Sequence, residues 1–217
     1  MSTATASPII ITLDGNIGAG KSTLLEYIRT HLPEIMIVQE PVNTWTSMVD
    51  KATGKNLLEL FYEDKRRWAY TFQNCAILTR LRTLMDAVKA AKPGQIILTE
   101  RSVLTDRYVF AEMLRDSGDI SSLEWDLYER WFDSFARDLP IRGIIHVTTG
   151  PGTSAARIVK RGRHGEEHIP LEYLQALDEQ HRKWIATTSL PVLEISTEEG
   201  TDRDGTVERV WEFLQGF

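Results

Sequence analysis

Residues 15–23 constrain the fold of this 217-residue chain more than any other segment. They read Gly-Asn-Ile-Gly-Ala-Gly-Lys-Ser-Thr, which fits the pattern G-x-x-x-x-G-K-[ST] from Gly15 to Ser22. A β-branched apolar run, Ile9–Leu13, precedes the glycines, and a segment with helical spacing follows them. A strand, a glycine-rich loop and a helix in this order predict a phosphate-binding loop, in which backbone N–H groups close around phosphate oxygens.

The side chains of this loop predict a nucleoside triphosphate as the ligand. Lys21 is placed to reach the β- and γ-phosphates, and the Ser22 hydroxyl is placed to ligate Mg²⁺. An ordinary tight turn between a strand and a helix is the alternative, which the flanking patterns make less favourable. The ATP-binding residues predicted in the loop are Gly15, Asn16, Ile17, Gly18, Ala19, Gly20, Lys21, Ser22 and Thr23.

Composition narrows the classes of protein to which the chain can belong. Its length suits one α/β domain, and 31 acidic against 25 basic residues give a formal net charge of −6. This charge argues against a nucleic acid polymer as a partner. No run of about 18 apolar residues is present, so we expect no membrane span. A single cysteine excludes an intrachain disulfide, and a cytoplasmic location is the simplest expectation.

Strand and helix patterns alternate along the chain and predict one α/β domain over residues 1–217, with residues 1–8 as a flexible tail. Five short apolar runs joined by helices predict a five-stranded parallel sheet with helices on both faces. The strands are expected at 9–13, 35–39, 95–99, 141–147 and 192–196. The helices are expected at 21–32, 56–91, 102–117, 121–138, 152–163, 170–188 and 204–216.

Polar residues close two of the predicted strands, at the sheet edge where ligands of such folds bind. Glu40 follows the second strand and could accept a proton from an attacking hydroxyl. Glu100 and Arg101 follow the third strand, where Glu100 could hold Mg²⁺ and Arg101 could neutralise a transferring phosphoryl group. Taken separately, Glu40 could be a solvated strand end, and Ser102 could simply cap a helix. The position of these residues beside a phosphate loop favours a functional role.

A basic cluster follows the fourth predicted strand. Arg157 and Arg161 are four residues apart and share a helix face, and Arg163 follows after a glycine. Together with the glycine-containing segment after them, they predict an Arg-rich lid over residues 157–168. Such a lid closes over a triphosphate and excludes water, which would otherwise hydrolyse it. A solvated charged face is the alternative.

The helical pattern at 56–91 carries a polar pair on an apolar face. Gln73 and Arg80 are seven residues apart and point the same way, with the small Ala76 between them. Gln73 offers one donor and one acceptor, as the edge of a nucleobase requires. Asp106 could pair with Arg80 and also accept from an exocyclic amine. The alternative is that these polar groups only hold two helices together, and periodicity does not separate the two interpretations.

Taken together, these motifs resemble those of the deoxyribonucleoside kinase family, which includes deoxycytidine and deoxyguanosine kinases. The resemblance covers about residues 9–188 and implies the P-loop kinase fold, ATP and Mg²⁺, a deoxynucleoside acceptor and a role in nucleotide salvage. The matching motifs are Gly15–Thr23, Glu40-Pro41-Val42, Phe61-Tyr62-Glu63, Arg67-Trp68, Thr71-Phe72-Gln73, Glu100-Arg101-Ser102, Asp106-Arg107-Tyr108, Arg161-Gly162-Arg163 and Ile169-Pro170-Leu171-Glu172-Tyr173.

The resemblance also implies residue roles. Glu40 is similar to the general base for the sugar 5′-hydroxyl, and Arg101 and Lys21 complete the implied catalytic set. Ser22 and Glu100 form the implied metal site. Either Glu166 or its neighbour Glu167 corresponds to the carboxylate that binds the 3′-hydroxyl together with Tyr62. The lid arginines are Arg157, Arg161 and Arg163, and the substrate-binding residues are Glu40, Trp45, Tyr62, Phe72, Gln73, Ala76, Arg80, Arg101, Asp106, Phe110 and Glu166. Because the family is usually homodimeric, we expect a homodimer.

The base preference follows from Arg80 and Asp106. Family members that prefer thymidine resemble each other in having small or apolar residues at these two positions. An Arg–Asp pair would crowd a 5-methyl group and would be left unpaired by thymine, which can cost 10⁴–10⁵ in selectivity, about 5–7 kcal/mol. We therefore predict deoxycytidine, deoxyadenosine or deoxyguanosine over thymidine, and the sequence does not choose among these three.

Two other functions are compatible with a phosphate loop. A nucleoside monophosphate kinase would share the loop and the lid, but it would need a cationic site for the phosphate of its acceptor where Glu40 stands. A non-enzymatic nucleotide switch would be expected to carry an Asn-Lys-x-Asp guanine-binding motif, and the chain has none.

Overall fold

The computed structural model describes residues 6–163, 165–166 and 169–217. Most of the predicted flexible tail, residues 1–5, lies outside the described residues. So do residues 164, 167 and 168 of the predicted lid. Within the described part of the chain, no helix is long and apolar enough to cross a membrane.

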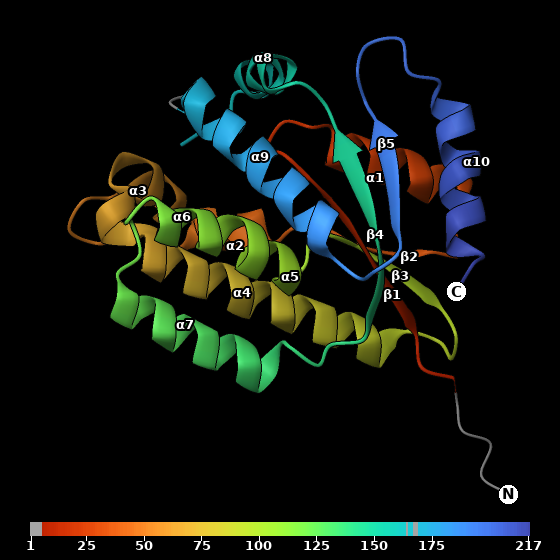
Figure 1. The fold of residues 1–217 in the computed structure, drawn as a ribbon, viewed down its shortest axis with the longest axis horizontal. Coiled ribbons are helices and arrows are strands. Elements are labelled where there is room, and N and C mark those ends of the chain that lie inside the picture. The colour runs from red at the N-terminus through yellow and green to blue at the C-terminus, as the bar shows by residue number, and fades with distance from the viewer. Residues whose placement is uncertain (1–5, 164, 167–168) are drawn as a thin grey trace, which may run out of the picture.

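In the described part of the chain, five parallel strands form one sheet in the order β2-β3-β1-β4-β5 (Figure 1). This confirms the predicted parallel sheet. From the central strand β1 the chain first forms the edge strand β2, then returns to form β3 between β2 and β1, and then adds β4 and β5 on the other side of β1. The carboxyl end of β1 therefore lies at the switch point, where ligands of such sheets bind. The strands are β1 (Ile9–Gly15), β2 (Met36–Val38), β3 (Ile96–Glu100), β4 (Ile141–Thr148) and β5 (Val192–Ser196).

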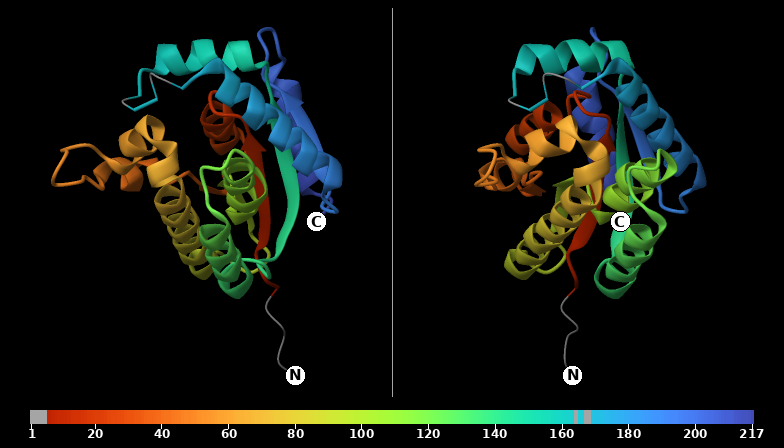
Figure 2. Two further views of the ribbon diagram at one scale, coloured as in Figure 1. Left: turned by 60° about the vertical axis from the view of Figure 1, so that its left-hand side comes forward. Right: turned by 90° about the vertical axis from the view of Figure 1, so that its left-hand side faces the viewer.

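Helices cover both faces of the sheet, as predicted (Figures 1 and 2). Neighbouring residues of a strand point to opposite faces, so Ile10 and Ile11 of β1 belong to different apolar clusters. Helices α1 (Lys21–His31) and α10 (Arg203–Leu214) cover the face of Ile11. The face of Ile10 packs against α4 (Lys65–Ala90) and α7 (Ser122–Phe135), and farther along it α8 (Pro151–Arg161) and α9 (Leu171–Thr187) pack on β4.

The prediction of a single helix at 56–91 is wrong. Two helices, α3 (Leu57–Glu63) and α4, meet at Asp64, whose backbone is not helical (φ −140°, ψ 82°). The Asp64 carboxylate accepts from the Arg67 N–H at 3.1 Å and so caps α4. Asp is a preferred helix-capping residue because its short side chain reaches the free N–H groups of the first turn. The break places Tyr62 and Gln73 on separate helices.

Three further differences from the expected helices lie around the sheet edge. Helix α2 (Val42–Ser47) was not predicted and directly follows Pro41. The segment predicted as a helix at 102–117 comprises α5 (Val103–Thr105), a π-helical turn η1 (Asp106–Ala111) and α6 (Glu112–Asp116). Helix α8 ends at Arg161 because Gly162 adopts a left-handed conformation (φ 59°). Single π-helical turns occur frequently at functional sites, and η1 begins at Asp106.

Candidate active site

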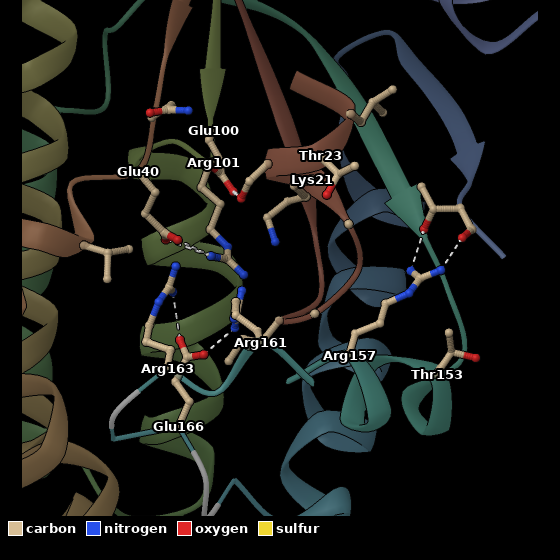
Figure 3. Close-up of a pocket in the computed structure, with 18 of the residues that line it drawn as sticks. Lys21, Thr23, Glu40, Glu100, Arg101, Thr153, Arg157, Arg161, Arg163 and Glu166 are labelled. Atoms are coloured by element: carbon tan, nitrogen blue, oxygen red, sulfur yellow. Dashed lines mark hydrogen bonds and ion pairs between the residues drawn. The ribbon is translucent and has the colours of Figure 1, made fainter. Parts of the chain in front are cut away.

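A large cavity of about 1090 Å³ lies at the carboxyl edge of the sheet (Figure 3). Its wall combines the phosphate loop after β1 with residues after β2, β3 and β5, and with side chains from α2, α3, α4, η1 and α8. Most of the predicted site residues line it. These are Ile17, Gly18, Gly20, Lys21, Ser22, Thr23, Glu40, Trp45, Tyr62, Phe72, Gln73, Ala76, Arg80, Glu100, Arg101, Asp106, Phe110, Arg157, Arg161, Arg163 and Glu166.

Three predicted ATP-binding residues, Gly15, Asn16 and Ala19, do not line the cavity and hold its wall from beneath. The Gly15 carbonyl accepts from Lys21 Nζ and from Arg101 Nη2, both at 3.2 Å, and the Asn16 carbonyl accepts from Lys21 Nζ at 2.8 Å. The Ala19 carbonyl accepts from the Thr197 hydroxyl at 2.6 Å. They face inward because the loop turns these carbonyls toward the protein, where those of Gly15 and Asn16 hold cations of the site and that of Ala19 holds Thr197.

Two glycines make the course of the loop possible. Gly15 has φ +150°, and a Cβ there would lie 2.3 Å from the Val147 carbonyl oxygen. Gly18 has φ +76°, and a Cβ there would lie 2.5 Å from the Ser154 carbonyl oxygen. Both conflicts are with backbone atoms, which cannot move away as a flexible side chain does. The loop therefore requires glycine at these positions for space as well as for backbone conformation.

We call the part of the cavity beside the loop at residues 15–23 its phosphate end. It contains the cation of Lys21 and two predicted metal-binding side chains, Ser22 and Glu100. Burial lowers the pKa of Lys21 to about 7, and the Arg101 charge adds to this effect against the opposing carboxylates of Glu100, Glu40 and Asp14. A polyanion would supply the missing counter-charge. The Ser22 hydroxyl donates to Glu100 Oε1 at 2.8 Å, and Glu100 is buried. This brings the two predicted metal ligands together.

Glu40 lies at the centre of the cavity between two arginines. Its Oε1 accepts from Arg101 Nη1 at 2.7 Å and from Arg80 Nη1 and Nη2 at 3.1 and 2.9 Å, whereas Oε2, among the described residues, accepts only from Arg101 Nη1, at 2.9 Å. Burial by itself would raise the pKa of Glu40, but the charges of Arg101, Arg80 and Lys21 outweigh burial and lower it to about 2. Glu40 is therefore ionised across the physiological pH range.

The backbone of Arg101 is strained. Arg101 has φ +56°, and no other non-glycine residue of the described chain has a positive φ. The turn is fixed by its N–H, which donates to the Leu13 carbonyl at 3.0 Å, and by its carbonyl, which accepts from the Thr99 hydroxyl at 2.9 Å. Such a conformation costs about 1–3 kcal/mol. The strained turn directs the guanidinium toward Glu40, and within the described structure its buried Nε has no hydrogen-bond partner.

We call the part of the cavity lined by the predicted base-binding residues its base end. It contains the predicted Arg80–Asp106 pair, which the structure confirms. Arg80 Nε donates to Asp106 Oδ1 and Oδ2 at 3.1 and 3.0 Å. Burial raises the pKa of Asp106 to about 7, because it outweighs the opposing charge of Arg80. The Arg80 guanidinium also lies 5.2 Å from the ring centroid of Trp45, whose Nε1 donates to the Thr79 hydroxyl at 2.9 Å.

Gln73 lies beside this pair with an unused acceptor. The residue is 1% exposed, and its Oε1 has no hydrogen-bond partner among the described residues. Phe72 stacks on Phe61 with ring centroids 4.6 Å apart, and Phe110 lies 5.0 Å from the Arg101 guanidinium. A buried acceptor without a partner costs about 1–3 kcal/mol. Its position in the wall of an aromatic-lined cavity is typical of a ligand-binding group.

The three predicted lid arginines divide into two groups (Figure 3). Arg163 donates to Glu166 Oε1 at 2.9 Å, and Arg161 donates to Glu166 Oε2. Arg157 instead donates to the carbonyl and hydroxyl of Thr197, at 2.6 and 3.3 Å. Glu166 is buried and lines the cavity, whereas Glu167, the alternative carboxylate, lies outside the described residues.

Sequence patterns did not identify Thr197, which follows β5 and helps to complete the phosphate end. Thr197 bonds to both Ala19 and Arg157. The Glu198 carboxylate accepts from the Gly150 N–H, the Thr149 hydroxyl and the Thr153 hydroxyl, at 2.5, 2.8 and 3.1 Å, and so ties this segment to the start of α8. The same strand-end rule that singled out Glu40 and Glu100 would have found Thr197.

One cavity thus joins a triphosphate-binding loop to a pocket with hydrogen-bonding groups for a second molecule, and this arrangement defines a P-loop kinase. The family model of deoxynucleoside kinases matches residues 11–215. The chain belongs to the deoxynucleoside kinase family.

Curated relatives agree with this assignment. The chain is 41% identical to a probable deoxycytidine kinase of fowlpox virus, over 86% of the chain and 77% of the relative. It is 34% identical to human deoxycytidine kinase, over 94% and 90% of the two chains. It is 30% identical to the mitochondrial deoxyguanosine kinase of Xenopus laevis, over 95% and 89%. The prediction of an ATP-dependent deoxynucleoside kinase is confirmed, in preference to a monophosphate kinase or a nucleotide switch.

Proposed function

We propose that this chain transfers the γ-phosphate of ATP to the 5′-hydroxyl of deoxycytidine, in nucleotide salvage, and that deoxyadenosine and deoxyguanosine are also better acceptors than thymidine. The observation that carries the proposal is the unpaired Gln73 Oε1 beside the Arg80–Asp106 pair, in the same cavity as the phosphate loop. The curated relatives named as deoxycytidine kinases support the choice of base.

Cytosine fits the donors and acceptors at the base end. Its exocyclic amine can donate to Gln73 Oε1, and its ring nitrogen can accept from the Gln73 amide N–H. Asp106 can accept the second hydrogen of the same amine. Thymine presents a carbonyl oxygen in place of this amine, so it would face the Asp106 carboxylate without a donor. Rejection then follows from buried polar groups that are left unpaired.

Glu40 aligns the acceptor hydroxyl in this proposal. Its Oε1 already accepts three hydrogen bonds and Oε2 accepts one, so Oε2 has the free capacity for a sugar 5′-hydroxyl. With a pKa near 2, Glu40 is a weak base. A weak base is sufficient because phosphoryl transfer is largely dissociative and depends mostly on positioning and charge stabilisation. Glu40 therefore orients the hydroxyl and takes its proton as the new P–O bond forms, while Arg101 and Lys21 stabilise charge.

Tyr62 and Glu166 bind the sugar 3′-hydroxyl in this proposal, and Arg161 and Arg163 bind the triphosphate. The support for this is that both arginines are already gathered on Glu166 at the cavity wall. When a 3′-hydroxyl takes part of the hydrogen-bonding capacity of Glu166, the two arginines become available to phosphate oxygens. Arg157, which is held by Thr197, supports the loop after β5 under the ATP base.

We propose Ser22 and Glu100 as the protein ligands of Mg²⁺. A hydroxyl and a carboxylate 2.8 Å apart are hard oxygen donors, and Mg²⁺ usually takes one or two carboxylates and completes its shell with phosphates and water. Within the described residues, no group of three or more His, Cys, Asp or Glu side chains could hold a metal ion without such help. Mg²⁺ would neutralise charge on the β- and γ-phosphates.

A homodimer through α4 and α7 is the proposed assembly. Exposed apolar side chains lie on both helices, which pack against each other: Leu78, Met85, Leu123, Leu127, Trp131 and Phe135. Exposed apolar surface of this extent on neighbouring helices is typical of a protein interface. Sedimentation of the wild type and of Trp131→Asp tests it, with a dimer expected for the first and a monomer for the second. A cytoplasmic location is proposed from the single cysteine and is tested by fractionation.

Initial rates of ATP-dependent phosphorylation of the four deoxynucleosides, with thymidine monophosphate as a control acceptor, test the proposed function. We expect deoxycytidine to give the highest kcat/KM and thymidine the lowest. Thymidine as the best acceptor would contradict the assigned base selection and leave the kinase activity standing. Turnover of the monophosphate alone would contradict the proposed acceptor.

A further inference from the structure

Arg80 contacts two carboxylates at once. Its Nε donates to Asp106 at the base end, and its Nη1 and Nη2 donate to Glu40 Oε1 at the centre of the cavity. Arg80 is 6% exposed, Asp106 is 1% exposed, and the Glu40 side chain is 11% exposed. One guanidinium therefore connects the group that selects the base to the group that faces phosphoryl transfer. Among the described residues, no hydrogen bond or ion pair joins Gln73, the other base-binding side chain, to Glu40.

Because the guanidinium is rigid, its orientation at Asp106 also determines its orientation at Glu40. Its five N–H groups are fixed in one plane, so the direction of Nε–H sets the direction of both Nη groups. Asp106 accepts from Nε with both oxygens, and the Trp45 ring lies 5.2 Å from the guanidinium. With its Nε edge held at Asp106, Arg80 must direct its Nη groups at Glu40 Oε1.

We infer that Arg80 is a positioning residue for phosphoryl transfer as well as a base-binding residue: it occupies Glu40 Oε1, leaves Oε2 to the acceptor hydroxyl and transmits the engagement of Asp106 by the base to Glu40. The inference rests on the proposed deoxynucleoside kinase reaction. It adds a consequence for specificity, because a base that disturbs Asp106 also disturbs the alignment of the reacting oxygen. Wrong bases should then be rejected in the chemical step as well as in binding.

The charges around Glu40 make its pKa a measurable indicator of this role. The groups that face it are Arg101 after β3, Lys21 of the phosphate loop, Arg80 of α4, Tyr62 of α3 and Asp106 of η1. Burial favours the neutral form of Glu40, and Arg101, Arg80 and Lys21 together outweigh it. Loss of Arg80 removes one of these three cations and two hydrogen bonds to Oε1. The pKa of Glu40 should rise by about 1–3 units, the range of effect of an adjacent arginine.

The experiment is the pH dependence of kcat/KM for deoxycytidine in the wild type, Arg80→Met, Arg80→Lys and Gln73→Leu. This profile reports the pKa values of essential groups in the free enzyme. We expect Arg80→Met to lose activity as the pH falls through about 5 to 3, beyond any loss that the wild type shows over the same range, and Arg80→Lys to reduce this extra loss. Gln73→Leu is the matched control, since it removes a base-binding group without a contact to Glu40. It should raise KM and keep the wild-type profile, including any limb that belongs to deoxycytidine itself.

A second variant guards against a folding defect. Arg80→Met leaves the buried Asp106 without its cation, so Arg80→Met/Asp106→Asn is measured in the same way. The double variant should show the same acid limb as Arg80→Met. Profiles of both variants that match the wild type, with only KM raised, would overturn the positioning role and leave Arg80 as a base-binding residue. Absence of deoxynucleoside phosphorylation by the wild type would overturn the proposed function instead, so the two failures are distinguishable.

Discussion

The two ends of the cavity are built in different ways. At the phosphate end, the site is formed mostly by the backbone of consecutive residues in one loop. Gly15 and Gly18 set the course of the loop, and the carbonyls of Gly15 and Asn16 accept from Lys21. At the base end, side chains from α2, α4 and η1 converge, and Arg80 and Asp106 meet only in the folded chain.

This difference has a chemical consequence. A backbone-built site offers N–H groups and fixed charge, which suit the phosphates that every nucleoside triphosphate shares. A side-chain-built site offers individual donors and acceptors, which suit the choice of one base among several. Glu40 stands between them, in contact with Arg101 from one end and with Arg80 from the other.

Substitution of the residue at this junction should have the largest effect. We expect Glu40→Gln to lower kcat by about 10²–10⁴-fold, because the amide cannot take a proton from the 5′-hydroxyl. Binding of deoxycytidine and of a non-hydrolysable ATP analogue, measured by calorimetry, should change little. A large loss of binding at either end with kcat preserved would contradict the assigned role, and it would show that the two ends are not separable at Glu40.

The dependence of the phosphate end on backbone geometry is tested by Gly15→Ala. The added Cβ would lie 2.3 Å from a backbone oxygen at φ +150°, so we expect a loss of about 3 kcal/mol in the free energy of unfolding. Gly152→Ala in α8 is the matched control, since its Cβ would meet nothing within 4 Å, and it should change stability by about 1 kcal/mol or less. Urea denaturation measures both. Equal stability of the two variants would contradict a backbone-built phosphate end.

In the proposed complex the sugar lies between the two ends, and Glu166→Gln tests the proposed recognition of its 3′-hydroxyl. A hydrogen bond to a charged group contributes about 1.5–3 kcal/mol, so the preference for deoxycytidine over 2′,3′-dideoxycytidine should fall by about 10–100-fold. The ratio of kcat/KM values for the two acceptors is the measurement. Glu172→Gln on the exposed side of α9 serves as the control and should keep the wild-type ratio. An unchanged ratio in Glu166→Gln would reassign the 3′-hydroxyl to another residue.

The last test concerns the charge buried at the base end. Because Asp106 has a folded-state pKa near 7 and an ordinary pKa of 3.8, the native state binds a proton that the unfolded state releases between these pH values. The free energy of unfolding should therefore contain a term that decreases as the pH rises from about 4 to 7, by about 1.4 kcal/mol per pH unit at most. Asp106→Asn removes this term, so the stability of the variant relative to the wild type should rise over this range. Urea denaturation at several pH values measures the difference, and parallel curves would contradict a raised pKa.

The same contrast explains how far the sequence was informative. The phosphate loop, the parallel sheet and the ends of β2 and β3 follow from short patterns, because the residues that determine them are neighbours in the chain. Helix spacing placed Gln73 and Arg80 on one face, yet the contact of Arg80 with Glu40 joins positions far apart in sequence and has no local signal. The break at Asp64 and the π-helical turn at Asp106 were also not predicted. Whether a helix stops or widens at such a point depends on tertiary packing, which local sequence patterns do not report.

The contact between Thr197 and the phosphate loop has a consequence for how the protein is made. The loop at residues 15–23 leaves the ribosome early, but Thr197, which supports it at Ala19, comes after the last strand of the sheet. Helix α10, which packs beside α1 against the same face of the sheet, is synthesised later still. A nascent chain therefore carries the nucleotide motif long before it has a complete nucleotide site, and ATP can assist folding only at the final stage of synthesis.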